Sequence, residues 1–295
     1  MEVRRAGALT TVQDHGRRGY AHLGVPRSGA LDRPALSWAN RLVGNPPSAA
    51  GLELTVTGAT LRLWVATTVA LTGAPARLRV AGAEAPFGVP VPVPAGAEVR
   101  IGAAMVGVRS YLAVAGGITL PPVLGSRSTD TLSGLGPPPL ADGVVLPVGA
   151  AARVPRPDPA PDRRAGPGQL AAPGSGTTLR LHPGPRRDWL TDASLAGLLA
   201  GSYQVSPLSN RIGARLTGGP PLHRARAGEL ASEGMTLGAV QVPSDRQPLI
   251  LLADHPTTGG YPVVAIVEPA DLPLLAQLRP GAPVRFRPHE TSQWT

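Results

Sequence analysis

The chain of 295 residues contains no cysteine and no lysine, and aromatic residues make up only 3% of it. Without cysteine, it forms no disulfide, no thiolate nucleophile and no thiolate metal site. Without lysine, it carries no biotinyl-lysine, no Schiff-base lysine and no P-loop lysine. The shortage of aromatic rings disfavours a single-strand nucleic-acid binder, whose bases stack on such rings. We therefore expect no nucleic-acid partner.

Long apolar runs are also missing from the sequence. No stretch approaches the roughly 18 consecutive apolar residues that a membrane helix needs. The first five residues, M-E-V-R-R, do not begin the apolar core of a signal peptide. The expectation is a soluble, cytoplasmic protein with no membrane partner.

Glycine and proline, in contrast, are abundant, with 37 and 35 residues. They follow no triplet period, which excludes a collagen-like chain. Hydrophobic residues make up 42% of the sequence, enough to build a packed core. Frequent turn residues in an apolar chain predict many short strands joined by tight turns.

The net charge of +9 is spread unevenly along the chain. Residues 151–187 hold seven arginines against two acidic residues, and this stretch is rich in proline. A basic chain can bind nucleic acid. Here the composition favours a solvated, arginine-rich linker over an anion-binding arm.

The pattern along the chain predicts two mostly-β domains, 1–149 and 177–295. Residues 150–176 lose apolar periodicity and form a Pro/Arg-rich linker, with a long surface insertion as the alternative. Each block contains short strands around one or two helices. A tandem of two similar mixed barrels fits this organisation, with part of the chain crossing between them, although no strong internal repeat is visible.

Helix signals occur at three places in the sequence. Asp32 predicts an N-cap for a helix over 33–43, and Asp188 predicts a cap for a helix that Gly201 ends. A shorter helix is expected over 271–278. Alternating or short apolar runs predict strands at 60–65, 68–72, 76–80, 99–101, 106–114, 178–182, 240–242, 249–253, 263–267 and 284–286.

Polar clusters in the first half could carry chemistry. Gln13, Asp14 and Arg17 lie in one glycine-bounded loop, where Asp14 could act as an acid or base and Arg17 could hold an anion. The alternative is a turn in which Asp14 binds backbone amides and pairs with Arg17. Ser28 lacks the glycines of a nucleophile elbow, so a plain turn competes with a catalytic role. A third cluster consists of Ser126, Arg127 and Ser128, whose hydroxyl groups and guanidinium suit binding of a carboxylate or phosphate. The alternative is an ordinary polar loop tip.

The second half offers further candidates. Asn210 and Arg211 provide an amide and a guanidinium fork, and Glu233 is a candidate base or a surface carboxylate. Asp254 follows an apolar strand, directly before a turn that can bind an anion through hydroxyls and backbone amides. The binding residues predicted in that turn are Thr257, Thr258, Gly259 and Gly260. The candidate acid–base groups are thus Asp14, Glu233 and Asp254.

Metal and nucleotide motifs are missing from the sequence. The six histidines lie far apart and do not follow a metal-ligand spacing, so no metal site is predicted. There is no Walker A motif and no G-x-G-x-x-G after a strand.

Seven segments together resemble one family, and they occur in that family's order. The segments are T-V-Q-D-H-G-R-R-G-Y at 11–20, G-V-P-R-S-G-A-L-D at 24–32, Y-L-A-V-A-G-G-I at 111–118, L-G-S-R-S-T at 124–129, S-E-G at 232–234, Q-V-P at 241–243 and L-L-A-D-H-P-T-T-G-G-Y-P at 251–262. The chain resembles the biotin-dependent carboxyltransferase-like proteins. This family includes the C subunit of prokaryotic 5-oxoprolinase, proteins long called the second subunit of allophanate hydrolase, an antikinase partner and the carboxyltransferase region of urea carboxylase.

The resemblance implies two cyclophilin-like β-barrel domains and a role as an enzyme subunit. It implies partners, the B and A subunits of 5-oxoprolinase, and ATP-dependent opening of 5-oxoproline to glutamate. ATP with Mg²⁺ would then bind in a nonstandard pocket shared with a partner subunit. The chain departs from common family members in the insertion at 150–176 and in His255-Pro256, where others often have Arg-Gln.

Two other functions stay open at this point. One is carboxyl transfer from carboxybiotin to a urea-like amide, with biotin attached to another polypeptide because this chain has no lysine. The other is a regulator without enzymatic activity that binds an antikinase-like partner. For an enzyme, we expect the loops 13–17, 126–129, 210–211 and 254–260 to face one groove between the domains.

Overall fold

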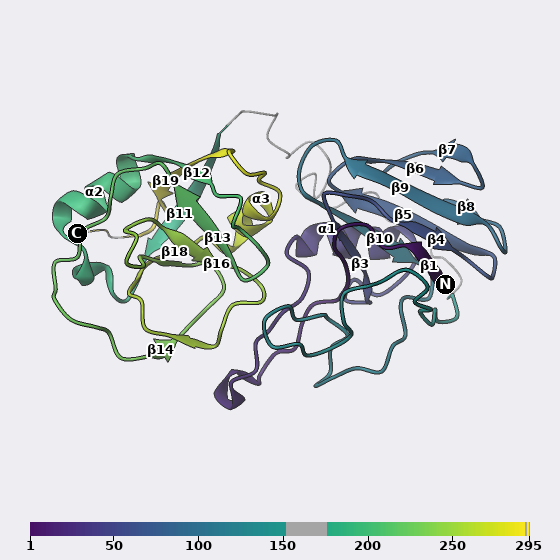
Figure 1. Cartoon of the computed structure of the whole chain (residues 1–295), viewed down its shortest axis with the longest axis horizontal. Coiled ribbons are helices and arrows are strands. Elements are labelled where there is room, and N and C mark those ends of the chain that lie inside the picture. The colour runs from purple at the N-terminus through teal and green to yellow at the C-terminus, as the bar shows by residue number, and fades with distance from the viewer. Residues whose placement is uncertain (152–175, 293, 295) are drawn as a thin grey trace. The chain divides into compact units, whose positions relative to one another are not determined.

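The computed structural model describes residues 1–151, 176–292 and 294 of the chain. The described residues form two compact units (Figure 1). Residues 1–17 and 28–151 belong to the first unit, whereas residues 18–27 join the described C-terminal residues in the second. The predicted linker over 150–176 lies, apart from its first two residues and its last, outside the described residues.

The first unit contains two five-stranded sheets whose strand pairs are all antiparallel. One sheet has the order β1 (Glu2–Arg5), β4 (Thr60–Arg62), β9 (Glu98–Ala104), β6 (Ala76–Val80) and β7 (Ala83–Ala85). The other has the order β2 (Thr10–Gln13), β3 (Gly51–Thr55), β10 (Arg109–Val114), β5 (Thr67–Gly73) and β8 (Val91–Val93). Buried aliphatic side chains from both sheets form one core, including Leu52, Leu61, Leu71, Leu78 and Leu112.

Helix α1 (Arg33–Leu42) covers the second of these sheets, against β5 and β10. The Asp32 carboxylate accepts a hydrogen bond from the Ala35 N–H at 3.0 Å, which confirms the predicted N-cap. The Asp32 N–H in turn donates to the Tyr111 hydroxyl at 2.8 Å. That hydroxyl donates to the buried Glu53 carboxylate, also at 2.8 Å. Burial and the Glu53 charge raise the pKa of Tyr111 well above its ordinary value.

The second unit is a closed seven-stranded barrel. Its order is β11 (Thr177–Pro183), β18 (Val263–Val267), β15 (Ala239–Gln241), β16 (Leu249–Leu251), β13 (Gly213–Thr217), β12 (Ser202–Val205) and β19 (Pro283–Pro288). Strands β11 and β19 run parallel, and the other pairs are antiparallel. A separate two-stranded ribbon joins β14 (Glu233–Gly234) to β17 (Thr258–Gly259).

Helix α2 (Asp192–Ala200) packs against β19 and begins later than the sequence predicts. Its cap is Thr191, whose hydroxyl accepts from the Ser194 N–H at 3.2 Å. The prediction that Asp188 caps this helix is therefore wrong. Asp188 lies in the 3₁₀ turn η4 (Arg187–Trp189) and pairs with Arg226. Further along the chain, the helix predicted over 271–278 is shorter in the structure. Helix α3 covers Leu272–Ala276, and the 3₁₀ turn η5 (Pro269–Asp271) precedes it.

The predicted mostly-β fold class is confirmed, with a closed barrel in the second unit and two packed sheets in the first. A 3₁₀ turn, η1 (Ala21–Leu23), lies in the segment 18–27 that joins the second unit. Across the described residues, the helices are too short or too polar to span a lipid bilayer.

Candidate functional site

The Asp14 carboxylate is the centre of a buried hydrogen-bond network in the first unit. Asp14 directly follows β2, and its side chain accepts four hydrogen bonds from two segments of the chain. The donors are the Gly16 N–H at 2.7 Å and the Ser126 hydroxyl, the Arg127 N–H and the Ser128 hydroxyl, each at 2.6 Å. Asp14 therefore joins two loops that lie far apart in the sequence, since 112 positions separate it from Ser126.

Arg17 and Gln13 reinforce the same pair of loops. Arg17 as a residue is 2% exposed, and its guanidinium donates to the Ser128 carbonyl oxygen at 2.6 Å. The Gln13 amide is fully buried and donates to the Thr129 carbonyl oxygen at 3.0 Å. The Arg127 guanidinium donates to the Leu120 carbonyl oxygen. These contacts show that the predicted binding residues of this half are brought together and that they hold the loop around residue 126.

Ser28 lies beside this network in a left-handed backbone conformation, with φ of 53°. Its hydroxyl donates to the Thr129 carbonyl oxygen at 2.8 Å. A residue with a Cβ adopts this conformation only at an energetic cost, which the surrounding hydrogen bonds must offset. The contact places Ser28 in the hydrogen-bonded framework of the first unit.

Arg211 and Asp254 form a buried ion pair in the second unit. The Nε and Nη2 atoms of Arg211 donate to the two carboxylate oxygens of Asp254, each at 2.9 Å. The side chains are 2% and 0% exposed. The neighbouring Asn210 accepts the N–H groups of Ile212 and Gly213 at 2.8 and 3.2 Å, as in an Asx turn. Two residues predicted for different roles, anion binding and acid–base chemistry, are thus partners of each other.

Glu233 occupies a more accessible position, on the β14–β17 ribbon. It pairs with Gly259 across the ribbon, and Gly234 pairs with Thr258. The Arg186 guanidinium donates to both carboxylate oxygens of Glu233, and its Nε lies 2.9 and 3.0 Å from them. This hydrogen-bonded cation lowers the pKa of Glu233 below its ordinary value, so that the group is a carboxylate at neutral pH. The Glu233 side chain is 28% exposed and the Arg186 side chain 38% exposed.

A buried glutamine connects this ribbon to two neighbouring segments of the chain. The Gln241 amide donates to the Tyr261 carbonyl oxygen at 3.1 Å and lies 3.1 Å from the Met235 sulfur. A Cβ at Gly259 would lie 3.3 Å from the Gln241 amide nitrogen and 3.4 Å from Met235. Glycine at this position therefore allows the close approach that joins the segments 232–234, 241–243 and 257–261.

The structure thus brings the predicted residues together in three groups. The first group lies in the first unit and consists of Gln13, Asp14, Arg17, Ser126, Arg127 and Ser128. The second group lies in the second unit and consists of Asn210, Arg211 and Asp254. The third group, also in the second unit, consists of Glu233, Thr257, Thr258, Gly259 and Gly260. That these loops share one groove stays a prediction. Sequence reasoning missed Arg186, which lies 47 positions from Glu233 and follows no recognisable spacing.

Comparison with known proteins identifies the family. The model of the carboxyltransferase domain, subdomains A and B, matches residues 23–288. The chain is 40% identical to the C subunit of 5-oxoprolinase from Escherichia coli over 97% of this chain and 90% of that protein. It is 33% identical to urea amidolyase of Saccharomyces cerevisiae over 98% of this chain, but over only 16% of that protein.

A solved structure agrees with this assignment. The crystal structure of Kluyveromyces lactis urea carboxylase superposes with a TM-score of 0.88 at 31% identity. The match covers 97% of this chain and 27% of that chain, so the protein described here spans about a quarter of its length. The resemblance found in the sequence motifs is confirmed. The chain belongs to the family of carboxyltransferase domains with subdomains A and B.

Proposed function

We propose that this chain is the C subunit of an ATP-dependent 5-oxoprolinase and acts with the A and B subunits to hydrolyse 5-oxo-L-proline to L-glutamate. The observation that carries the proposal is the extent of the match. The chain spans 90% of the E. coli 5-oxoprolinase C subunit, against 16% of the yeast urea amidolyase. The sequence identity is also higher to the 5-oxoprolinase C subunit, at 40% against 33% for the yeast urea amidolyase.

The chemistry of the proposed reaction explains why ATP and several subunits are needed. The lactam of 5-oxoproline is a resonance-stabilised amide that resists water. Phosphorylation of its oxygen would make the ring carbon a better electrophile, and fixed cationic and N–H donors would stabilise the developing negative charge. Because this chain has no Walker A motif and no lysine, we propose that ATP with Mg²⁺ binds in a pocket shared with a partner subunit.

Glu233 and Arg186 are the groups that we propose for substrate contact. Of the three candidate carboxylates, Asp14 is 7% exposed and Asp254 is fully buried, whereas the Glu233 side chain is 28% exposed. The Arg186 guanidinium donates to Glu233 through Nε and Nη2, and its remaining N–H groups would donate to the carboxylate of 5-oxoproline. Thr258 and Gly259 lie across the ribbon and provide a hydroxyl and backbone groups beside this pair.

Glu233→Gln and Arg186→Gln are each expected to lower turnover by about tenfold or more, since a charge-assisted contact contributes about 1.5–3 kcal/mol. Folding should survive, because a partly exposed ion pair adds little stability. Glutamate release by the reconstituted complex measures the effect. Arg226→Gln is the matched control, since Arg226 forms an exposed ion pair with Asp188 in the same unit. Turnover of both variants within twofold of the wild type would exclude these residues from the site.

The structural similarity to urea carboxylase supports one alternative function. In that case the chain would move a carboxyl group from carboxybiotin, carried by another protein, to a urea-like amide. A 5-oxoprolinase consumes 5-oxoproline and ATP, whereas the carboxyltransferase would consume carboxybiotin and a urea-like amide. Addition of a partner protein that carries carboxybiotin, together with urea, should give no product if the chain is a 5-oxoprolinase component. It should give carboxylated urea and free biotin on the partner if the chain is a carboxyltransferase.

A further inference from the structure

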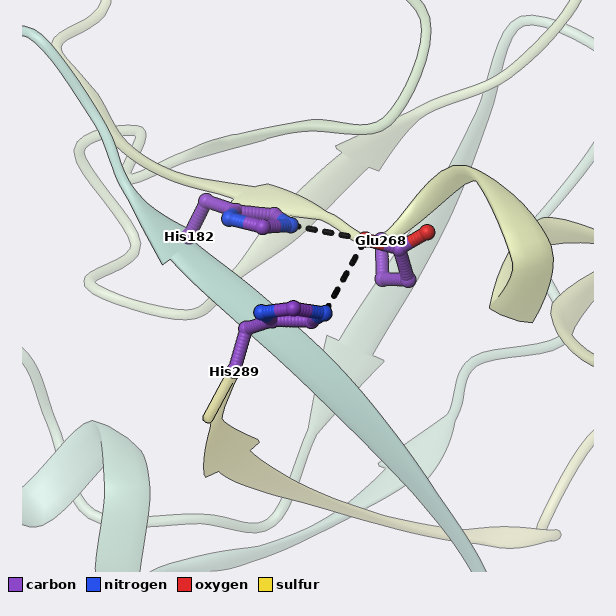
Figure 2. A group of neighbouring side chains, drawn as sticks. All are labelled: His182, Glu268 and His289. Atoms are coloured by element: carbon purple, nitrogen blue, oxygen red, sulfur yellow. Dashed lines mark hydrogen bonds and ion pairs between the residues drawn. The ribbon is translucent and has the colours of Figure 1, made fainter. Parts of the chain in front are cut away.

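Two histidines and one glutamate meet at neighbouring strand ends of the barrel in the second unit (Figure 2). His182 lies near the end of β11, Glu268 directly follows β18 and His289 directly follows β19. Strand β11 pairs with both of the other strands. The backbones are also tied at this point, because the Glu268 N–H donates to the Arg180 carbonyl oxygen and the His289 N–H to the Leu181 carbonyl oxygen, each at 2.8 Å. The barrel itself therefore fixes the three side chains close together.

The two imidazoles direct the same ring nitrogen toward one carboxylate oxygen. Nε2 of His182 lies 2.7 Å from Oε2 of Glu268, and Nε2 of His289 lies 3.7 Å from the same oxygen. The rings are stacked, with centroids 4.4 Å apart (Figure 2). In a tetrahedral zinc site with ligand bonds of about 2.0–2.2 Å, two ligand atoms lie about 3.4 Å apart. The two distances to Oε2 bracket this value and the ligand atoms all lie within 4.8 Å of one another, so side-chain rotations would bring the three atoms around one ion.

The opposite ring nitrogens have their own polar partners. Nδ1 of His182 lies 2.9 Å from the Ser292 hydroxyl, and Nδ1 of His289 lies 3.0 Å from the Thr291 hydroxyl. Without a metal, Nε2 of His182 donates to the Glu268 carboxylate, and the Thr291 N–H lies 3.4 Å from Nδ1 of His289. With an ion bound, each hydroxyl would accept an Nδ1–H, which leaves the lone pair on Nε2. A hydrogen bond to the ring nitrogen that faces away from the metal orients a histidine ligand and fixes its tautomer.

We propose that His182, Glu268 and His289 bind a divalent transition-metal ion, with Zn²⁺ as the matching ion. Two imidazoles and one carboxylate form a donor set that zinc accepts readily, whereas Mg²⁺ and Ca²⁺ prefer oxygen ligands alone. The side chains of His182, Glu268 and His289 are 33%, 20% and 22% exposed, so water can reach a fourth coordination position. The site shares no residue with Glu233 and Arg186, and it stands independently of the proposed 5-oxoprolinase activity.

Equilibrium dialysis of the metal-free full chain against Zn²⁺ tests the proposal. The wild type should bind one zinc ion per chain, and His182→Ala and His289→Ala should each weaken that binding at least tenfold. Glu268→Gln keeps the size of the side chain and an oxygen acceptor, and should also weaken binding about tenfold while thermal unfolding of the metal-free chain stays close to the wild type. His22→Ala and His223→Ala are the matched controls, because both histidines are exposed and lie outside the cluster. Absence of stoichiometric zinc binding, or binding that survives all three ligand variants, would overturn the assignment.

Discussion

Replacement of Asp14 by alanine should destabilise the first unit by about 3–5 kcal/mol, since hydrogen bonds to a charged group contribute about 1.5–3 kcal/mol each and do not add fully. The carboxylate accepts from two hydroxyls and two backbone N–H groups in a buried position. Alanine would remove every acceptor at once and leave these donors without that partner. The loop around residue 126 would then lose its main connection to the end of β2.

Urea unfolding of the purified chain measures this loss, and hydrogen exchange at the amides of β3 and β10 reports the first unit separately. The control is Glu84→Ala, since Glu84 forms an exposed ion pair with Arg79 in the same unit. That change should cost less than about 1 kcal/mol. A loss in free energy of unfolding no larger for Asp14→Ala than for Glu84→Ala would show that Asp14 does not hold the loops together. A purely catalytic role of Asp14 would then be the better explanation.

Arg211→Ala should destabilise the second unit by about 3–5 kcal/mol, because it leaves the Asp254 charge buried without its bidentate partner. The geometry supports a large effect: both hydrogen bonds measure 2.9 Å and the Asp254 side chain is fully buried. The double variant Arg211→Met with Asp254→Leu removes both charges. It should lose less stability than Arg211→Met alone or Asp254→Leu alone, since apolar side chains can replace a buried ion pair at small cost.

The measurement is a double-mutant cycle by urea unfolding, with hydrogen exchange at the amides of β13 and β16. Arg226→Ala serves as the exposed control, and its pair with Asp188 should contribute less than about 1 kcal/mol. Additive single-variant effects, with no coupling between residues 211 and 254, would argue against the ion pair as the source of the stability.

Local signals in the sequence predict the first helix well. Asp32, the proline in the first turn and the apolar spacing all concern residues within one or two turns of each other, and α1 has the predicted start and cap. The strands at 76–80 and 263–267 also have the predicted bounds, because their apolar residues stand out from polar or turn residues on both sides.

Competition between nearby capping residues explains the main local error. Asp188 and Thr191 are both good N-cap residues, and residue preference alone favours Asp188. In the structure Thr191 caps α2, while Asp188 lies in the turn η4 and pairs with Arg226. The choice depends on tertiary contacts that neither residue type reveals.

The candidate site shows the same division between local and non-local information. Motif order indicates that Glu233 and the turn at 257–260 matter, but their pairing across the β14–β17 ribbon depends on chain folding. Residue type alone predicts Arg17 and Arg211 as anion contacts. The structure gives them the Ser128 carbonyl oxygen and the Asp254 carboxylate as partners, which sequence spacing does not encode.

The histidine and glutamate cluster is invisible in the sequence for the same reason. His182 and Glu268 are 86 positions apart, and no metal-ligand spacing relates them. They meet because β11 pairs with both β18 and β19 in the closed barrel. Only the strand order of the folded barrel brings the three side chains to one place.

Reconstitution of the complete enzyme tests the central claim most directly. The purified A and B subunits from the same organism are combined with this chain, 5-oxo-L-proline and ATP, and glutamate release is measured with and without each component. Glutamate should form only when this chain and ATP are both present, and Glu233→Gln should lower its rate by about tenfold or more. Full glutamate release by the A and B subunits without this chain would contradict the account.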